Sequence, residues 1–310
     1  MISSRKQLCN ADIIVIKAGT TVVSTPDGYP CISRMAALVE SAVKLSRDNK
    51  KVIIISSGSV GVGKSILRRQ EYKMGLKGAA LSTWHNSACA ASGQLGLMSL
   101  YDTMFSQYEV PTSQLLVTCF DFDNDERRNN IKCVLQDLLS HGIVPVINEN
   151  DAVSANQGFK IFGDDTFSDN DSLAAIVSGL VEAKLMILLT DVAGVFNKPP
   201  SEPDAELIDI FEETTSFKEG QKSSVGRGGM GAKVGAVLRA LDNGVEAALI
   251  APGGEHDVVD KIMSGSNCGT LFLRAIRDGN FVPAEDEVPI PLRKNPSFKE
   301  EMRVEDMARG

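Results

Sequence analysis

Polar clusters at the ends of two apolar runs constrain the fold of this chain more than any other feature of its sequence. The apolar runs 143–147 and 185–189 have the composition of buried strands, and they end at 148–151 and at Thr190-Asp191. A third polar cluster, 167–171, lies between them. In open α/β sheets, ligands bind outside the carboxyl ends of the strands. The three clusters, rich in carboxylates and amides, therefore predict one binding site at such an edge.

Helix capping is the alternative explanation for any one of these polar residues. Asp and Asn after a strand commonly cap the next helix or form a turn, and Asp169 or Asn170 could do only that for the helical pattern at 173–180. Capping does not account for all three clusters together. The carboxylates of Asp165, Asp169 and Asp171 repel one another unless a cation lies near, so we expect positive charge beside them.

Composition excludes several classes of protein. The 310 residues, 43% of them hydrophobic, suffice for one large domain or two small ones. The formal net charge of -8 argues against a nucleic-acid partner or an anionic membrane surface. The N-terminal residues lack the apolar core of a signal peptide, and no apolar run is long enough to cross a membrane. The six cysteines form no C-x-x-C pair and the three histidines show no ligand spacing. We therefore expect a soluble, cytoplasmic protein with no metal site built by its own side chains.

Strand and helix patterns alternate along the chain. Strands are predicted at 13–16, 52–55, 115–118, 143–147, 185–189, 245–250 and 269–273. Helical patterns occur at 32–47, from about 60 onward, within 79–107, and at 131–139, 173–180, 234–241 and 257–263. Such alternation is typical of an α/β fold in which a largely parallel open sheet lies between two layers of helices (αβα). Residues 277–310 lack a clear period and predict a tail or a short appendage.

Two glycine-containing turns carry lysines in positions that suit a phosphate group. Lys17 ends the first strand and precedes Gly19 and two threonines, which brings a positive charge to a turn with backbone N–H groups. The loop 226–233 places Lys233 in the first turn of a helix, where a lysine is unfavourable unless an anion lies there. The alternative for Lys17 is a surface lysine that closes a strand, and the alternative for the loop 226–233 is a flexible linker before a helix. Residues 56–59, before another helix, also suit an anion.

A P-loop pattern predicts a rival function. Residues 58–65 match G-x-x-x-x-G-K-[ST] after a strand and before a helix, as that motif requires. In a P-loop protein Lys64 would hold the β- and γ-phosphates, and Asp191 could hold Mg2+. This hypothesis leaves the turn at Lys17 and the loop at Gly228 unexplained. A hydrolytic triad fits poorly, because no histidine lies near any cluster, whereas phosphoryl transfer needs positioning and cations more than covalent chemistry.

Six short motifs occur in one order along the chain. They are Lys17-Ala-Gly-Thr-Thr, Ser56-Ser57-Gly58, Asn148-Glu-Asn-Asp151, Phe167-Ser-Asp-Asn-Asp171, Leu188-Leu189-Thr190-Asp191 and Gly228-Gly-Met-Gly-Ala-Lys233. Together they resemble the amino acid kinase superfamily and, within it, the glutamate 5-kinase (gamma-glutamyl kinase) family. The resemblance extends over residues 12–273, and the set N-E-N-D, F-x-D-N-D and G-G-M-x-x-K in that order is specific although each motif is short.

The resemblance implies ATP-dependent phosphorylation of the side-chain carboxylate of L-glutamate to gamma-glutamyl phosphate, the first step of proline biosynthesis. Mg2+ would be bound mainly by the phosphates of ATP, and L-proline is expected as a feedback inhibitor. The resemblance also implies an amino acid kinase domain at 1–275 and a tail at 276–310, with no additional C-terminal RNA-modification-type domain. The apolar region 79–108 indicates a homo-oligomer, either a dimer or a tetramer.

The residues that the resemblance implies fall into three groups. The catalytic group is Lys17, Lys233, Asp171 and Asp169, in which the lysines flank the transferred phosphoryl group, Asp171 orients them and Asp169 supports the set. The residues implied for L-glutamate are Ser57, Gly58, Asn148, Asp151 and Asn170. The residues implied for ATP are Lys17, Gly19, Thr190, Asp191, Arg227, Gly228, Gly229, Met230, Gly231, Ala232 and Lys233.

The sequence departs from the family pattern in three places. The family usually has a small residue or threonine where Arg227 stands, the segment 163–167 is longer than in many relatives, and the Ser-Ser-Gly motif does not normally continue into Gly-Lys-Ser. Three alternatives stay open besides glutamate phosphorylation. They are a P-loop NTPase, a sibling kinase acting on acetylglutamate or aspartate, and a non-catalytic amino-acid sensor.

Overall fold

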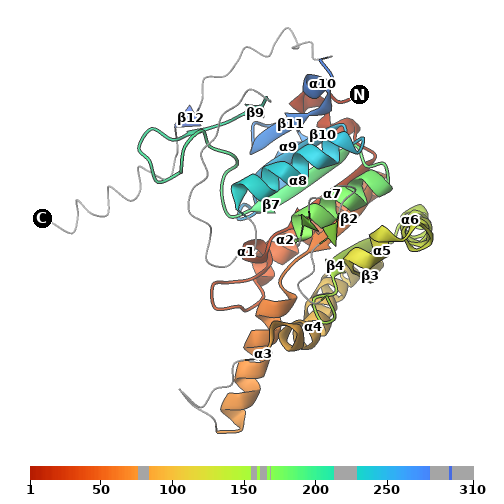
Figure 1. Cartoon of the computed structure of the whole chain (residues 1–310), viewed down its shortest axis with the longest axis vertical. Helices are drawn as coiled ribbons and strands as arrows, with labels where there is room; N and C mark the ends of the chain where they lie inside the picture. The colour runs from red at the N-terminus through yellow and green to blue at the C-terminus, as the bar shows by residue number, and fades with distance from the viewer. Residues whose placement is uncertain are drawn as a thin grey trace, which may run out of the picture.

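An eight-stranded sheet forms the centre of the molecule (Figure 1). The computed structural model describes residues 1–75, 84–154, 159–160, 166–167, 169–212, 229–279 and 293–294. The strand order is β3-β4-β2-β1-β7-β10-β11-β9. Neighbouring strands are parallel except β10 and β11, which are antiparallel. The prediction of an α/β fold with a largely parallel sheet is therefore confirmed.

The strands of this sheet are β1 (Ile13–Ala18), β2 (Lys51–Ser56), β3 (Thr112–Val117), β4 (Val144–Glu149), β7 (Leu185–Thr190), β9 (Ile210–Phe211), β10 (Ala247–Pro252) and β11 (Thr270–Leu273). Two further pairs, β5 (Phe159–Lys160) with β6 (Thr166–Phe167) and β8 (Glu206–Leu207) with β12 (Arg293–Lys294), lie outside it. The helices are η1 (Arg5–Asn10), α1 (Thr20–Val23), α2 (Ile32–Arg47), α3 (Ser59–Lys73), α4 (Asn86–Ser106), α5 (Cys119–Asp123), α6 (Asp125–Ser140), α7 (Asn170–Leu180), α8 (Met230–Asp242), α9 (Val258–Met263) and α10 (Arg274–Arg277).

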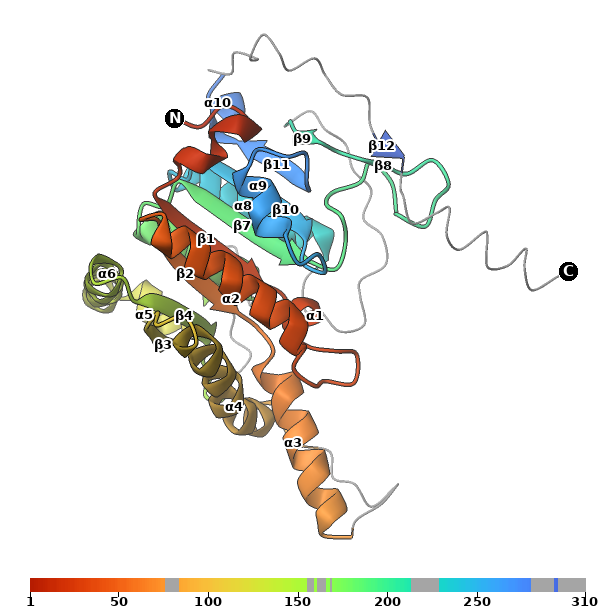
Figure 2. The same cartoon turned by 180° about the vertical axis from the view of Figure 1, so that it is seen from behind.

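Helices cover both faces of the sheet, because alternate side chains of each buried strand point to opposite faces. In β1, Ile14 and Ile16 pack in the core under α2, α4 and α9, whereas Val15 packs in the core under α6, α7 and α8. Figures 1 and 2 show these two layers of helices from opposite sides. Among the described residues, no helix is both long enough and apolar enough to cross a membrane.

The predicted elements differ from the observed ones mainly at polar ends. Helix α6 begins at Asp125, earlier than the predicted 131, because the side chain of Asn124 accepts a hydrogen bond from the backbone N–H of Arg127 and caps a polar first turn. Strands β8 and β9 were not predicted, since two residues are too few to show a period. The start of the predicted 79–107 helix lies partly outside the described residues, and α4 begins at Asn86.

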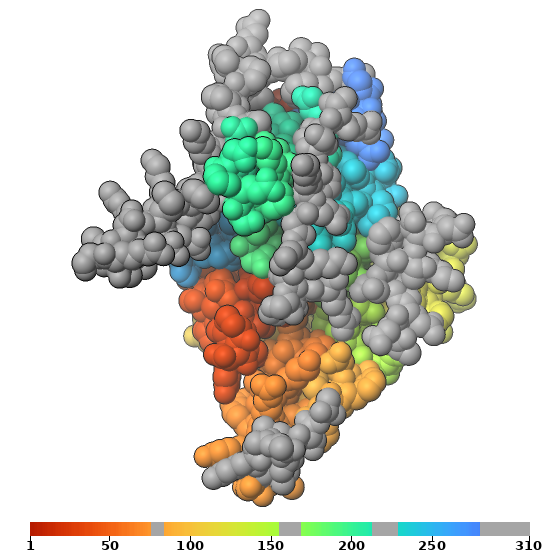
Figure 3. Space-filling view, turned by 60° about the vertical axis from the view of Figure 1, so that its left-hand side comes forward, coloured from red at the N-terminus to blue at the C-terminus, as the bar shows by residue number. Residues whose placement is uncertain are grey.

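Helix α3 contradicts the P-loop hypothesis. Gly58, with φ of 111°, immediately precedes the helix, and α3 begins at Ser59. Gly63 and Lys64 therefore lie inside the helix, where backbone N–H groups are used by helical hydrogen bonds and cannot wrap a phosphate. The side chain of Lys64 is exposed. The end of α3 extends away from the sheet in both ribbon views, and in the space-filling view of Figure 3 it lies at the opposite end of one face from the segment that follows β7.

Replacing the exposed Lys64 should leave the fold unchanged. We expect Lys64→Ala to alter the free energy of unfolding by no more than about 0.5 kcal/mol, because exposed substitutions away from caps and ion pairs have small effects. Urea denaturation of the variant beside the unaltered protein measures this. A loss several times larger would mean that the lysine makes a buried contact.

Candidate active site

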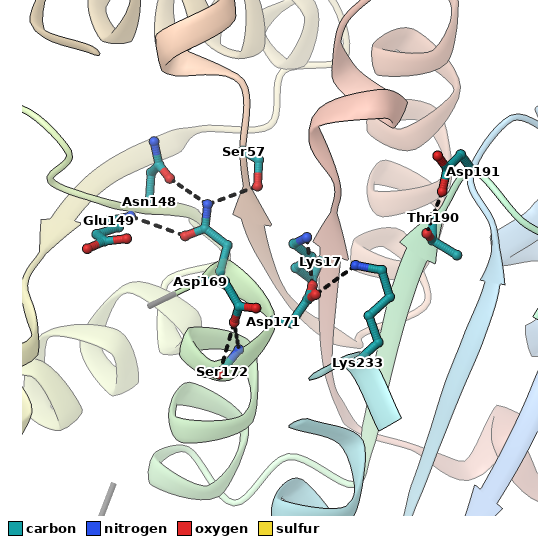
Figure 4. Close-up of polar contacts among 11 residues, drawn as sticks. Lys17, Ser57, Asn148, Glu149, Asp169, Asp171, Ser172, Thr190, Asp191 and Lys233 are labelled. Atoms are coloured by element: carbon teal, nitrogen blue, oxygen red, sulfur yellow. Dashed lines mark hydrogen bonds and ion pairs between the residues drawn. The ribbon is translucent and has the colours of Figure 1, made fainter. Parts of the chain in front are cut away.

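A buried carboxylate joins two lysines at the centre of the site. Asp171 lies in the first turn of α7, Lys17 near the end of β1, and Lys233 in the first turn of α8. The Nζ atom of Lys17 is 2.6 Å from Oδ1 of Asp171, and the Nζ atom of Lys233 is 2.8 Å from Oδ2 (Figure 4). The side chains of Asp171, Lys17 and Lys233 are 3%, 7% and 16% exposed. The structure thus brings together three residues predicted from distant motifs.

The lysines keep Asp171 ionised despite its burial. Desolvation raises the pKa of a buried carboxyl group, but the charges of Lys17 and Lys233 outweigh it and lower the pKa of Asp171 to about 2. Two ammonium groups beside one carboxylate leave one net positive charge in the cluster. The arrangement can therefore attract an anion, even though the lysine in the first turn of α8 already has a carboxylate partner.

Amide side chains form a second cluster beside the first. The Nδ2 atom of Asn170 donates to Oγ of Ser57 at 2.9 Å and to Oδ1 of Asn148 at 3.0 Å, while its Oδ1 accepts from the backbone N–H of Glu149 at 3.4 Å. These side chains come from the carboxyl ends of β2 and β4 and from the start of α7. Figure 4 shows Ser57, Asn148 and Glu149 on one side of the lysine cluster. Three predicted substrate residues are thus in contact with one another.

Two residues outside the predicted substrate group, Ser59 and Gln94, extend this amide cluster. Ser59, the first residue of α3, donates to Oδ2 of Asp151 at 3.3 Å. Asn148 donates through Nδ2 to Oε1 of Gln94 at 2.9 Å and to Oγ of Ser59 at 3.4 Å. Gln94 belongs to α4. The sequence signal near it is the pair of glycines Gly93 and Gly96 inside a helical pattern, which indicates close packing or a break and does not identify a polar contact.

Asp169 caps α7, the helix that contributes one residue to each cluster. Its Oδ1 accepts hydrogen bonds from the backbone N–H and from the hydroxyl of Ser172, both at 2.9 Å. This is the capping contact that the sequence suggested as the alternative for Asp169. The cap fixes the first turn of α7, which contains Asn170 and Asp171. A supporting role for Asp169 in the site stays a prediction.

Two of the residues predicted for ATP, Thr190 and Asp191, lie on the other side of the lysines. Thr190 ends β7 and donates to Oδ1 of Asp191 at 3.0 Å, and Figure 4 shows this pair across Lys233 from the amide cluster. Gly19 is held to the same strand, because its N–H donates to the carbonyl of Leu189 at 3.2 Å. Gly229, Met230, Gly231 and Ala232 lie at the start of α8. Arg227 and Gly228 lie outside the described residues.

The geometry suits the transfer of a phosphoryl group between two anions. Both clusters lie at the carboxyl edge of the parallel strands, where open α/β sheets bind ligands. The lysines stand between the amide cluster and Thr190-Asp191. Within the described residues, no group of three His, Cys, Asp or Glu side chains could hold a metal ion.

A family comparison matches most of the chain. The sequence model of the group described as "Amino acid kinase family" matches residues 12–252. The Delta-1-pyrroline-5-carboxylate synthase of Solanum lycopersicum is 39% identical over 281 residues, which are 87% of this chain and 38% of that protein. The chain therefore spans well under half of the length of this relative. The glutamate 5-kinase of Trichlorobacter lovleyi is 37% identical over 270 residues, 84% of this chain and 67% of that protein.

Solved structures resemble the fold at low sequence identity. A T. acidophilum isopentenyl phosphate kinase in its product complex has a TM-score of 0.55 and 15% identity, with 84% of this chain and 99% of that chain covered. An N-acetylglutamate synthase from Neisseria gonorrhoeae has a TM-score of 0.54 and 15% identity, with 84% of this chain and 59% of that chain covered. These likenesses bear on the fold alone.

The charge of Asp171 should make stability depend on pH. Its pKa is about 2 in the folded protein and about 3.9 in an unfolded chain, so its stabilising effect is complete above about pH 5 and is lost as the pH falls towards the folded pKa. Asp171→Asn lacks this dependence. The difference in unfolding free energy between the protein and the variant should narrow by about 2 kcal/mol between about pH 5 and pH 2. Urea denaturation at several pH values tests this, and a constant difference would contradict it.

Proposed function

Since the chain belongs to the amino acid kinase family, we propose that it transfers the γ-phosphoryl group of ATP to the side-chain carboxylate of L-glutamate. The product would be gamma-glutamyl phosphate, the first intermediate of proline biosynthesis. Relatives named glutamate 5-kinase that are 33–37% identical over 84% of this chain support this choice of substrate. The observation that carries the proposal is the Lys17–Asp171–Lys233 cluster, which lies between the amide cluster and the end of β7.

L-Glutamate would occupy the amide cluster. Ser57, Asn148 and Asn170 offer neutral donors and acceptors, and Asp151 carries the negative charge that an α-ammonium group needs. The side-chain carboxylate of the substrate would then point towards the lysines. Because the pKa of a glutamate side chain is about 4.3, the nucleophile is already ionised at neutral pH. The reaction therefore needs no residue to remove a proton.

The obstacle to transfer is repulsion between a carboxylate and the phosphates of ATP. An oxygen of the substrate carboxylate attacks the γ-phosphorus, and the bond from that phosphorus to the β,γ-bridging oxygen breaks, so that ADP leaves with the electron pair. Lys17 and Lys233 would contact the oxygens on which negative charge shifts during this step, and a preorganised donor of this kind contributes about 3–4 kcal/mol. Asp171 holds both ammonium groups in place before the substrates arrive.

ATP would bind along the end of β7 and the start of α8. Thr190, at the end of β7, and Asp191 after it would contact the nucleoside, and the residues from Gly229 to Lys233, at the start of α8, would contact its phosphates. When bound with ATP, Mg2+ supplies positive charge to the β- and γ-phosphate oxygens. The protein's own contribution there is the pair of lysines and the backbone N–H groups at the start of α8.

The proposal extends to the oligomeric state of the protein, its feedback inhibition and its location in the cell. We propose a cytoplasmic homo-oligomer, a dimer or tetramer, that uses the face of α4, where Leu95 is 79% exposed. Feedback inhibition by L-proline is a further proposal, based on the resemblance of the sequence. A sibling kinase for acetylglutamate or aspartate is less well supported, since relatives at 33–37% identity are named glutamate 5-kinase. A non-catalytic sensor is less well supported, since it has no use for a lysine pair beside a buried carboxylate.

A trapping assay tests the proposed reaction. The protein is incubated with MgATP and hydroxylamine, and L-glutamate, acetylglutamate, L-aspartate or no amino acid is added. ADP release is measured together with the coloured hydroxamate that an acyl phosphate forms. We expect both products with L-glutamate alone. Turnover of acetylglutamate or aspartate without turnover of glutamate would overturn the choice of substrate, and ADP without hydroxamate would overturn the reaction.

The two buried lysines should differ from the exposed one in their effect on turnover. Lys17→Ala and Lys233→Ala should each lower kcat by about a hundredfold or more with smaller changes in KM, because each removes charge needed mainly in the transition state. Lys64→Ala is the matched control and should stay close to the unaltered protein. Circular dichroism checks folding before kcat is measured at saturating substrates. Near-normal Lys17 and Lys233 variants beside an inactive Lys64 variant would refute the assignment.

Asp151 should control the affinity for glutamate alone. If Asp151 pairs with the substrate ammonium group, Asp151→Ala should weaken glutamate binding by about 2–5 kcal/mol, because one partner of a desolvated charge pair is lost. The KM for MgATP should change little. Asp151 contacts Ser59, which accepts a hydrogen bond from Asn148, and Figure 4 shows Asn148 on the far side of the lysines from Thr190. Both constants are measured in the trapping assay. A rise in the KM for MgATP at constant KM for glutamate would contradict this role.

A further inference from the structure

Helices α3 and α4 cross with their backbones in direct contact. A Cβ atom on Gly93 would lie 2.0 Å from the carbonyl oxygen of Ser59 and 2.4 Å from the backbone nitrogen of Gly63. A Cβ atom on Gly63 would lie 1.7 Å from the carbonyl oxygen of Cys89. Atoms cannot approach so closely without overlap, so only glycine fits at either position. Gly63, which belongs to the P-loop-like pattern 58–65, thus allows α3 to pack closely against α4.

The same crossing brings two hydrogen-bond partners to Asn148. Ser59 lies on α3, and its own carbonyl touches Gly93. Gln94 lies on α4 directly after Gly93. Asn148 donates to both side chains through one amide nitrogen, at 3.4 Å to Ser59 and 2.9 Å to Gln94. Any side chain at Gly93 that separated the helices would therefore separate these two partners.

A backbone N–H fixes the direction of the whole amide chain. The backbone N–H of Glu149 can only donate, so Asn170 must present its oxygen to it. The NH2 group of Asn170 then faces the oxygen of Asn148. The NH2 group of Asn148 must in turn face Gln94, which has to accept. Gln94 and Ser59 are thus the acceptors at the end of this chain, and the backbone N–H of Glu149 fixes the orientation of both asparagine side chains.

We propose that Gly93 and Gln94 are positioning residues for the acceptor substrate: the close crossing of α3 and α4 at Gly93 holds Gln94 and Ser59 where they orient Asn148. This inference rests on the proposed phosphorylation of glutamate. It assigns the α3–α4 crossing to acceptor recognition alone, because, in the part of the chain that the structure describes, the contacts of Gly93, Ser59 and Gln94 lead to Asn148 and not to Thr190, Asp191 or the lysine pair.

Gly93→Ala tests the crossing, and Gly96→Ala is its matched control. A Cβ atom on Gly96 would lie 3.8 Å from Cδ1 of Ile66 and 3.9 Å from Cγ1 of Val62, which is ordinary contact. Both changes replace a glycine of α4 by a better helix former. We expect Gly93→Ala to raise the KM for L-glutamate about tenfold with the KM for MgATP within about twofold, as loss of one or two hydrogen bonds predicts. Gly96→Ala should change neither constant.

The single tryptophan of the sequence reports whether the crossing has moved. Trp84 lies just before α4, and its Nε1 donates to Oε1 of Glu71 on α3 at 2.8 Å. Its fluorescence spectrum should therefore shift in Gly93→Ala and not in Gly96→Ala. A folded Gly93→Ala with a shifted spectrum but an unchanged KM for glutamate would overturn the inference, as would equal rises in both KM values.

Gln94→Ala decides the matter if Gly93→Ala does not fold. This change removes the acceptor without adding atoms to the crossing, and it should raise the KM for L-glutamate about three- to tenfold with little change for MgATP. An unchanged KM for glutamate in Gln94→Ala would refute the inference while the unaltered protein still forms hydroxamate, which leaves the proposed function standing. If the unaltered protein forms no hydroxamate from glutamate, the proposed function fails and the inference fails with it.

Discussion

A buried carboxylate between two lysines is the interaction on which the rest of the site depends. Taking Asp171 out of water is unfavourable unless positive charge lies beside it, and its two partners come from β1 and from the start of α8. Neither lysine could be buried to this extent without the carboxylate. The positions of the central strand, α7 and α8 in the folded protein are therefore coupled through this cluster.

The order of the strands separates the acceptor from the donor in the function we propose. β1 lies in the middle of the sheet, with β2 and β4 on one side and β7 and β10 on the other. Because all five strands are parallel, their carboxyl ends face the same edge. Polar residues after β2 and β4 form the amide cluster, and those after β7 face the nucleotide in the function we propose. Lys17, at the end of β1, lies at the boundary between the two.

The sequence predicted the sheet well and the finer contacts unevenly. Long apolar runs such as 185–189 have to be buried, so these strands were found where expected. Asp169 could be placed at a helix start, but its capping bonds depend on where α7 begins. Gly63 and Lys64 matched a phosphate loop in spacing, and only the start of α3 at Ser59 shows that they are helical. Gln94 was missed because its contact crosses from α4 to β4, which no local pattern reveals.

The first turn of α7 links the two halves of the site. Three consecutive residues have three different tasks there: Asp169 caps the helix, Asn170 joins the amide cluster, and Asp171 binds the lysines. Successive helical residues point about 100° apart, so one rigid turn can direct neighbouring side chains into adjacent subsites. The distance between the amide cluster and the lysines is then set by local helix geometry, which the hydrogen bond from Ser172 to the capping Asp169 holds fixed. A reaction that needs two anions in line benefits from such a fixed distance, because a small displacement of either substrate lowers the rate steeply.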